Sequence, residues 1–369
     1  MDKKFVMGIA AMAALTLVSC SSDDLDSFSD NSSKNEAISF DGYLGRSAVA
    51  VNGSRGSVLD KTQLHKSVDG FGVFGNYSPT EGGEPSNLFN NQKVTGDAAA
   101  DNKWKYDPVK YWPSQGYIDF WAYAPYDAGT KFTSTSIVDF TVKDKAADQK
   151  DLLWANNAVN QTKDNISGTG NKVTFHFKHA LSRLGYSVKL KDASYESVAT
   201  ITLNKITLAG STTEPTQNAF YIKGTIDLST GTWEKHSAGA SKQDFINWFS
   251  GPQDVTSATE SSPYKNPTSD YLFVIPQNFS EKIGEAENPD KLYVIVKYTI
   301  TYTDGRAPEI TNTVYKQITP NFVQGKAYTL NLTIGLPIEF DVDVVEDWKA
   351  PDDGTGDINI GSNTNPWER

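Results

Sequence analysis

Apolar and polar residues alternate with a period of two along most of the chain after Ile38. Clusters of Gly, Asn, Asp, Ser and Pro separate the alternating runs, which is typical of β-strands joined by turns. The clearest runs lie at 38–44, 292–302 and 328–334. Further strands are predicted at 71–77, 117–124, 137–142, 173–177, 184–190, 200–208, 220–228, 271–275 and 311–318. The pattern predicts an all-β protein.

Patterns typical of helices are few, and the segments 57–67, 144–154 and 241–249 are each expected to form a short connecting helix. Strands at this spacing favour β-sandwiches, in which each sheet buries one face against another. An aromatic-rich first half gives way to a Thr-rich second half near residue 182. We therefore expect two β-sandwich domains and a C-terminal tail, at 38–182, 183–348 and 349–369.

The first residues have the features of a secretion signal. Lys3 and Lys4 precede an apolar run that is too short to span a bilayer. The segment Leu17-Val18-Ser19-Cys20 resembles the bacterial lipobox, in which lipid is attached to the cysteine. We expect removal of residues 1–19 as a lipoprotein signal peptide, and lipidation of Cys20. Residues 20–37, rich in Ser and Asp, are then a lipid-anchored flexible tether.

The charge of the chain narrows its range of partners. The formal net charge is -11, and removing Asp2, Lys3 and Lys4 (a net +1) makes it -12. Such an acidic protein repels nucleic acid, so no nucleic-acid partner is expected. Cys20 is the only cysteine, so the lipidated protein has no thiol left for a disulfide or a metal site.

Candidate catalytic or metal-binding residues are scarce. The chain has four histidines, of which His176 and His179 lie three residues apart in an expected strand. Residues at this spacing project from opposite faces, so the pair is interpreted as structural. Neither a nucleophile elbow nor a phosphate-binding loop is present. We expect no cofactor, no metal and no enzyme activity.

Several motifs together make the chain similar to the fimbrillin family, the lipoprotein pilins and associated proteins of type V pili. These motifs occur in the family's order over nearly the whole mature chain. They are Asn91-Gln92-Lys93-Val94-Thr95, Trp104-Lys105-Tyr106-Asp107-Pro108, Lys110-Tyr111-Trp112-Pro113, Ile118-Asp119-Phe120-Trp121-Ala122-Tyr123-Ala124-Pro125, Asp151-Leu152-Leu153-Trp154-Ala155, Phe177 to Leu184, Phe273-Val274-Ile275-Pro276-Gln277 and Val342-Asp343-Val344-Val345-Glu346-Asp347-Trp348.

The resemblance implies two transthyretin-like β-sandwich domains and assembly into a surface fimbria by donor strand exchange. In this scheme a protease cuts near the N-terminus, the first strand leaves, and a strand of another subunit replaces it. The implied partners are other pilus subunits, the outer membrane through the lipid anchor before processing, and a receptor on a host or bacterial surface. The implied location is the cell outer membrane and the cell surface. A shaft, tip or anchor role stays open.

Two arginines are candidates for the protease cut. Arg46 and Arg55 follow the first predicted strand in a segment rich in Gly and Ser, the composition of an accessible loop. A cut after either residue would release the displaced first strand, with its apolar residues Ile38, Phe40 and Leu44. Both could equally be ordinary surface arginines.

The last alternating run is the candidate donor strand. Ile338, Phe340, Val342 and Val344 alternate with acidic residues there. Burying four such side chains would contribute roughly 6 to 12 kcal/mol before the ordering of the strand is subtracted. The same run could instead be the final strand of its own domain.

A surface-exposed glycan-binding lipoprotein is the alternative function. Aromatic residues crowd one stretch, and exposed rings on β-sheets can stack against sugars. The alternation around 117–124 favours rings that pack in a core or between domains over rings that bind sugar. The aromatic residues concerned are Trp104, Tyr106, Tyr111, Trp112, Trp121, Tyr123 and Tyr126.

Overall fold

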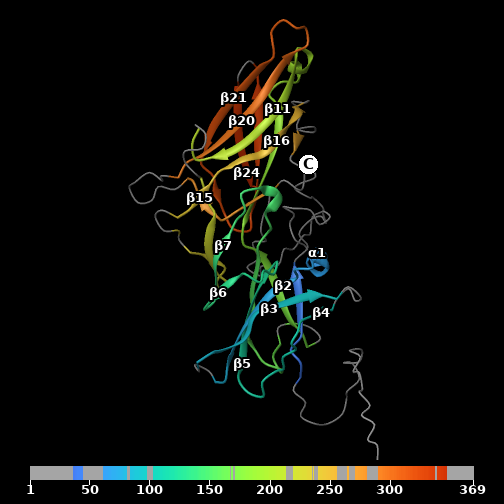
Figure 1. The fold of residues 1–369 in the computed structure, drawn as a ribbon, viewed down its shortest axis with the longest axis vertical. Coiled ribbons are helices and arrows are strands. Elements are labelled where there is room, and N and C mark those ends of the chain that lie inside the picture. The colour runs from blue at the N-terminus through green and yellow to red at the C-terminus, as the bar shows by residue number, and fades with distance from the viewer. Residues whose placement is uncertain are drawn as a thin grey trace, which may run out of the picture. The chain divides into compact units, whose positions relative to one another are not determined.

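The computed structural model describes residues 36–44, 61–80, 84–97, 103–166, 168, 171–212, 219–234, 236, 240–255, 264–265, 271–280, 290–336 and 339–346. Most of the regular structure in these ranges is β-strand (Figure 1). One short α-helix, α1 (Lys61–Lys66), and two 3-10 helices, Ala146–Asp148 and Ala193–Ser197, complete it. The all-β prediction is confirmed.

The first half of the chain builds a seven-stranded sheet in the order β1-β9-β8-β5-β2-β3-β4. All neighbouring strands are antiparallel except β1 and β9, which run parallel. The bounds are β1 (Phe40–Leu44), β2 (Phe71–Ser78), β3 (Ser86–Gly96), β4 (Trp104–Lys105), β5 (Tyr117–Ala124), β8 (Leu153–Gln161) and β9 (Val173–His179).

Two asparagines mark irregular positions in this sheet. Asn91 in β3 and Asn160 in β8 adopt positive φ angles of 49° and 55°. The pairing of β3 with β2, and of β8 with β5, shifts register beside these residues. Asparagine tolerates the left-handed region better than most residues, and one such residue inserts a β-bulge. The two strands therefore depart from strict alternation.

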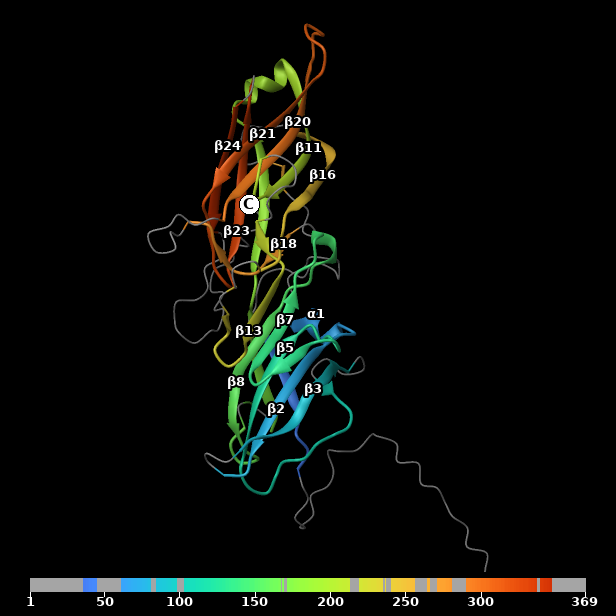
Figure 2. The ribbon, with the colours of Figure 1, turned by 60° about the vertical axis from the view of Figure 1, so that its left-hand side comes forward.

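The second half of the chain builds two further sheets, of five and four strands (Figures 1 and 2). In the five-stranded sheet, β10 pairs in parallel with β23 and antiparallel with β17 and β18, while β24 forms the edge beyond β23. The four-stranded sheet has the order β16-β11-β20-β21. The bounds are β10 (Ser182–Leu190), β11 (Ala199–Ala209), β16 (Phe245–Val255), β17 (Tyr264–Lys265), β18 (Leu272–Val274), β20 (Leu292–Tyr302), β21 (Ile310–Ile318), β23 (Ala327–Gly335) and β24 (Glu339–Glu346).

Three smaller sheets connect distant segments. The four-stranded sheet β14-β13-β7-β6 pairs residues from both halves of the sequence, because β7 hydrogen-bonds to β13. The other two are two-stranded, β12 with β15 and β19 with β22. The bounds are β6 (Lys131–Thr133), β7 (Ser136–Thr141), β12 (Phe220–Tyr221), β13 (Lys223–Asp227), β14 (Thr232–Trp233), β15 (Lys242–Gln243), β19 (Gln277–Asn278) and β22 (Asn321–Phe322).

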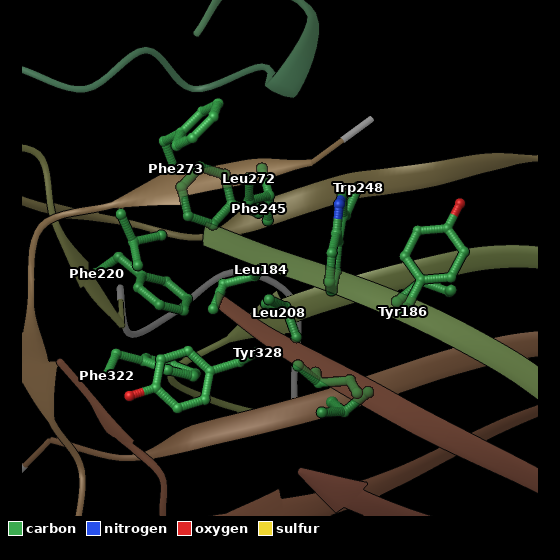
Figure 3. Close-up of a cluster of buried hydrophobic side chains, with 14 of the residues drawn as sticks. Leu184, Tyr186, Leu208, Phe220, Phe245, Trp248, Leu272, Phe273, Phe322 and Tyr328 are labelled. Carbon is green, nitrogen blue, oxygen red and sulfur yellow. The ribbon is translucent and has the colours of Figure 1, made fainter. Parts of the chain in front are cut away.

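Two hydrophobic clusters lie beneath these sheets. The smaller one draws only on residues between Ile38 and Phe177. The larger one joins strands of the second half to residues of the first half, among them Phe74, Tyr123 and Trp154. Figure 3 shows Leu184, Leu208 and Leu272 within it among aromatic rings. In this cluster Tyr186 and Trp248 meet edge to face, with ring centroids 4.9 Å apart. Such contacts fix the two sheets against each other.

Two of the expected helices are wrong. Residues 241–249 form β15 and the start of β16, and only a 3-10 turn forms within 144–154 before β8 begins. The spacing of Phe245, Trp248 and Phe249 resembles a helical face, yet all three are buried in a strand. Register shifts between β11 and β16 allow this, because a bulge changes which side chains face the core.

Candidate functional site

The candidate site is the position that the first strand occupies. β1 lies at one end of the seven-stranded sheet and pairs in parallel register with β9, from Phe40 opposite Val173 to Leu44 opposite Phe177. The segment before it is held by a different part of the chain. Ile38 N–H donates to the Lys110 carbonyl, and Trp112 N–H donates to the Glu36 carbonyl, both at 2.8 Å. The chain thus enters the sheet between residues 110–112 and β9.

Phe40 is the apolar centre of this position. Its side chain is 2% exposed and meets four aromatic rings at centroid distances of 5.2 to 5.7 Å. Burying a phenylalanine of this kind stabilises a fold by about 1.5 to 3 kcal/mol from transfer alone. Removal of β1 would therefore open a deep aromatic pocket. The four rings belong to Phe89, Tyr106, Phe120 and Phe175.

Two side chains in or near β4 donate hydrogen bonds to β1 and to the residues just before it. The Tyr106 hydroxyl donates to the Ile38 carbonyl at 2.7 Å, and Trp104 Nε1–H donates to Asp41 Oδ1 at 2.9 Å. Burial raises the pKa of the Tyr106 phenol, so this hydroxyl keeps its proton at neutral pH. Tyr106 therefore binds the backbone just before β1, and Trp104 binds the Asp41 carboxylate of the strand. We name the pocket around Phe40 together with these two donors the β1 seat.

Gly42 packs directly against side chains of the β1 seat. A Cβ atom at this residue would lie 3.4 Å from Phe177 and Trp104 side-chain atoms and 3.6 Å from Phe71. All three neighbours are side chains, which can move more readily than backbone. The seat thus accepts a small residue at this position without change, and a larger one only when the neighbouring rings shift.

The candidate donor strand lies in the five-stranded sheet of the same chain. β24 pairs antiparallel with β23 along eight positions, from Glu339 opposite Gly335 to Glu346 opposite Tyr328. Val342 is buried at 6% exposure and Val344 packs against the larger hydrophobic cluster. Lys316 on β21 forms an ion pair with Asp341 and donates to the Val342 carbonyl at 3.3 Å. β24 therefore forms the edge strand of a sheet in its own chain.

The predicted site residues fall into three groups. Ile38 and Phe40 are brought together in the smaller cluster, and Leu44 pairs through its backbone with β9. Val342 and Val344 lie on β24, as does the backbone of Phe340. The remaining candidates, Cys20, Arg46, Arg55 and Ile338, lie outside the described residues. Their proposed roles stay predictions.

The sequence analysis missed the groups that hold β1 from outside its own strand pairing. Trp104 and Tyr106 are far from β1 in sequence, and alternation alone gives Asp41 no role beyond that of a polar residue. A signal existed, because both aromatic residues belong to the stretch that raised the glycan alternative. The structure uses much of this stretch for packing, since Trp112, Trp121 and Tyr123 are buried. Tyr111, at 53% exposure, is the large aromatic side chain of the stretch that remains well exposed.

The histidines of β9 have structural surroundings. His179 is buried, and its Nδ1 lies 2.6 Å from Asp151 Oδ2. His176 is half-buried, and its backbone N–H donates to Asn157 Oδ1 at 2.8 Å. Within the described ranges, no three His, Cys, Asp or Glu side chains gather as metal ligands would. No helix in those ranges is both long and apolar enough to span a bilayer.

The fold and the β1 seat can now be compared with known proteins. A family model described as fimbrillin-like matches residues 58–367. The chain belongs to this fimbrillin-like family. No curated protein sequence matches it significantly.

Several solved structures are similar to the chain. A fimbrial protein from Bacteroides vulgatus is 20% identical, with a TM-score of 0.63 over 85% of this chain and 99% of its own. A candidate cell adhesion protein from Bacteroides uniformis is 16% identical, with a TM-score of 0.46 over 84% and 97%. The fimbrial anchor protein Mfa2 from Porphyromonas gingivalis is 12% identical, with a TM-score of 0.30 over 85% and 98%. The first of these shows that the chain has the fold of a fimbrial protein.

Family membership sets the class of function. The chain is a fimbrillin-like protein, and its family is structural rather than enzymatic. Fimbrial proteins act at the cell surface together with other fimbrial subunits, so the family implies both this location and partners of this kind.

Proposed function

We propose that the chain is a structural and adhesive subunit of a surface fimbria that assembles by losing its first strand and accepting a strand of another subunit. One observation carries this proposal. β1 is an edge strand whose Phe40 side chain fills an aromatic pocket, and the chain reaches Arg46 two residues after β1 ends. An edge strand can leave without breaking the remaining ladder, and the pocket it leaves needs a replacement.

The precursor in this proposal is a lipoprotein. Its signal peptide is removed before Cys20, and the lipid on Cys20 holds the tether at the outer membrane. Two transthyretin-like sandwiches, 38–182 and 183–348, follow. A cut after Arg46 or Arg55 separates β1 and the lipid from the rest of the protein. Adhesion to a host or bacterial receptor is the output of the assembled fimbria.

The proposed cut can be tested at the new N-terminus. Protein recovered from cell-surface fimbriae should begin at Ser47 or Gly56, and the double variant Arg46→Ala with Arg55→Ala should yield folded lipoprotein without filaments. Arg306→Ala is a matched control, because Arg306 is an exposed arginine in a turn near Asp304. Filaments that form normally from the double variant would contradict the proposed cleavage site.

A further inference from the structure

Two buried residues, Ala180 and Leu181, join the first half of the described chain to the second. They link β9, in the seven-stranded sheet, directly to β10, in the five-stranded sheet. We name this pair the joint. A short covalent link does not by itself keep two bodies from moving, because relative motion is usual between domains that share only a small interface. The segments that surround the joint therefore decide whether it bends.

Three separate segments hold the backbone of the joint. The Ala180 N–H donates to the Leu152 carbonyl at 2.8 Å, and the Ala180 carbonyl accepts Trp233 Nε1–H at the same distance. The Leu181 carbonyl accepts the Gly325 N–H at 3.0 Å. Leu152 precedes β8 in the first half, whereas Trp233 and Gly325 belong to the second half. The joint is thus hydrogen-bonded to both halves at once.

Trp233 belongs to a hairpin of the second half that pairs with a strand of the first. We name residues 223–233, which contain β13 and β14, the clasp hairpin. β13 pairs antiparallel with β7, and the buried residues Ile226 and Ile137 lie opposite each other in this ladder (Figure 2). The clasp hairpin therefore binds the first half through backbone hydrogen bonds as well as through the joint.

The turn of the clasp hairpin packs against β8. Gly231 has a positive φ of 74°, and a Cβ atom at this position would overlap the indole ring of Trp154. The side-chain amide of Asn156 donates to the Ser229 carbonyl at 2.6 Å. Trp154 pairs with Lys178 of β9, so this contact lies close to the joint along the chain. Strands β7 and β8 of the first half thus both hold the clasp hairpin.

From these contacts we infer that the clasp hairpin is a mechanical lock, which keeps the joint closed so that the two halves resist pulling as one body. The biological role of this lock rests on the proposed function. In the proposed fimbria the first half holds a neighbour at the β1 seat, and any pull on the second half reaches that seat through the joint. The clasp hairpin gives this pull a second path, from β14 through β13 to β7 and β8.

Pulling across the joint tests the lock. Cys20→Ser leaves the uncut chain without a thiol, so handles can be attached at Val68→Cys in the first half and Tyr315→Cys in the second, both at exposed positions. The clasp variant combines Trp233→Phe with Asn156→Ala. Under constant force in optical tweezers we expect a short extension that precedes the unfolding of either half. Its rate should be about tenfold higher in the clasp variant than in the parent protein, because two hydrogen bonds are lost.

A matched control variant loses the same two kinds of hydrogen bond within the halves. Trp104→Phe removes the indole bond to Asp41 in the first half, and Asn204→Ala removes the amide bond to Thr299 in the second. The rate of the short extension should match that of the parent protein. A control variant that opens as fast as the clasp variant would overturn the lock.

A disulfide between the clasp hairpin and β7 separates locking from general destabilisation. Thr141→Cys and Lys223→Cys replace exposed residues that are directly opposite, within the Cα separation that a disulfide needs. Without this disulfide, hydrogen exchange of the Ala180 amide should be about tenfold faster in the clasp variant than in the parent protein. The oxidised disulfide should restore the parent rate, and reduction should abolish the restoration. Fast exchange that persists after oxidation contradicts the lock.

All these measurements use the uncut chain, so they do not depend on strand exchange. Equal opening rates of the clasp variant and the parent protein overturn the lock and leave the proposed function standing. A locked joint in a protein that builds no filaments supports the lock and overturns its role in transmitting a pull between subunits.

Discussion

β1 and β10 each pair in parallel with one neighbouring strand, but their other edges differ. β1 pairs with β9 over five positions, and β10 pairs with β23 over eight. β10 also pairs on its other edge, with β18 and β17. β1 has no second ladder partner in the described part of the chain, where only the bridge from Ala37 to Tyr111 precedes it. β10 therefore lies inside its sheet, and β1 lies at the edge of its sheet.

The burial of a strand's side chains and the pairing of its backbone are separate properties. Phe40 and Leu184 are both fully buried, so each contributes strongly to its hydrophobic cluster. Their backbones are held very differently, because removing β10 would divide a sheet and removing β1 would only shorten one. A strand can thus be essential to a core and still be replaceable, provided that another strand supplies the same side chains.

The largest expected effect comes from truncating these two side chains. Phe40→Ala should lower the free energy of unfolding of the uncut chain by about 3 to 5 kcal/mol, and Leu184→Ala by about 2 to 5 kcal/mol. In assembled fimbriae the Phe40 variant, once cut, should match the parent protein, while Leu184→Ala stays destabilised. Urea unfolding of both forms checks this, with the exposed Val68→Ala as control. Equal behaviour of the two variants after assembly would break the comparison.

The next effect concerns Asp151, which binds the last residue of β9. Its carboxylate lies 2.6 Å from His179 Nδ1, and both side chains are buried. Asp151→Asn should lower the free energy of unfolding by about 1 to 2 kcal/mol, because the amide oxygen is a weaker acceptor for the His179 imidazole than the carboxylate oxygen. Asp69→Asn is a matched control in a surface pair with Lys150 and should change it by less than about 1 kcal/mol. Similar losses from both variants would show that the buried pair adds nothing special.

A smaller effect is expected where β9 passes into β10. Trp233 Nε1–H donates to the Ala180 carbonyl at 2.8 Å, and Ala180 lies between the two strands. Trp233→Phe should lower the free energy of unfolding by about 0.5 to 1.5 kcal/mol, because the carbonyl loses its donor. Thermal unfolding would measure the change, and an unaltered melting temperature would argue that solvent replaces the indole.

The smallest effect is electrostatic and depends on pH. The hydrogen bond from Lys316, followed by that from the Val342 N–H, lowers the pKa of Asp341. Its stabilising effect is present above the ordinary carboxyl pKa of about 4 and is lost as pH falls through the lowered value. Lys316→Met should thus weaken β24 attachment by at most about 1 kcal/mol at neutral pH, and by nothing in strong acid. Lys131→Met, in the exposed pair with Asp139, is the control; a pH-independent loss would contradict the assignment.

Whether a strand could be predicted from the sequence depends on how strictly its apolar and polar residues alternate. The run Leu292–Tyr302 was predicted with its bounds, because its buried residues recur at every second position. β3 and β8 were missed, since they are rich in asparagine and contain bulges at Asn91 and Asn160. The bulges remove the period of two that marks a strand.

Some residues of the candidate site could be predicted from the sequence and others could not. Ile38 and Phe40 follow from alternation, and the structure places both in the smaller cluster. The donors Trp104 and Tyr106 lie 63 and 68 residues from their acceptors, Asp41 in β1 and Ile38 just before it. No local pattern records such contacts. The parallel direction of β1 is equally invisible in the sequence, because alternation is the same in either direction.

The separation of β1 and β24 into different sheets has a geometric consequence. In the proposed strand exchange, with β24 as the predicted donor strand, the surface that gives a strand and the surface that receives one are distinct, so each contact between copies would be heterologous. A heterologous contact does not close on itself as a twofold dimer does, and it repeats into an open chain. Such a filament has a direction, and its two tips differ: one carries a vacant pocket and the other an unused strand.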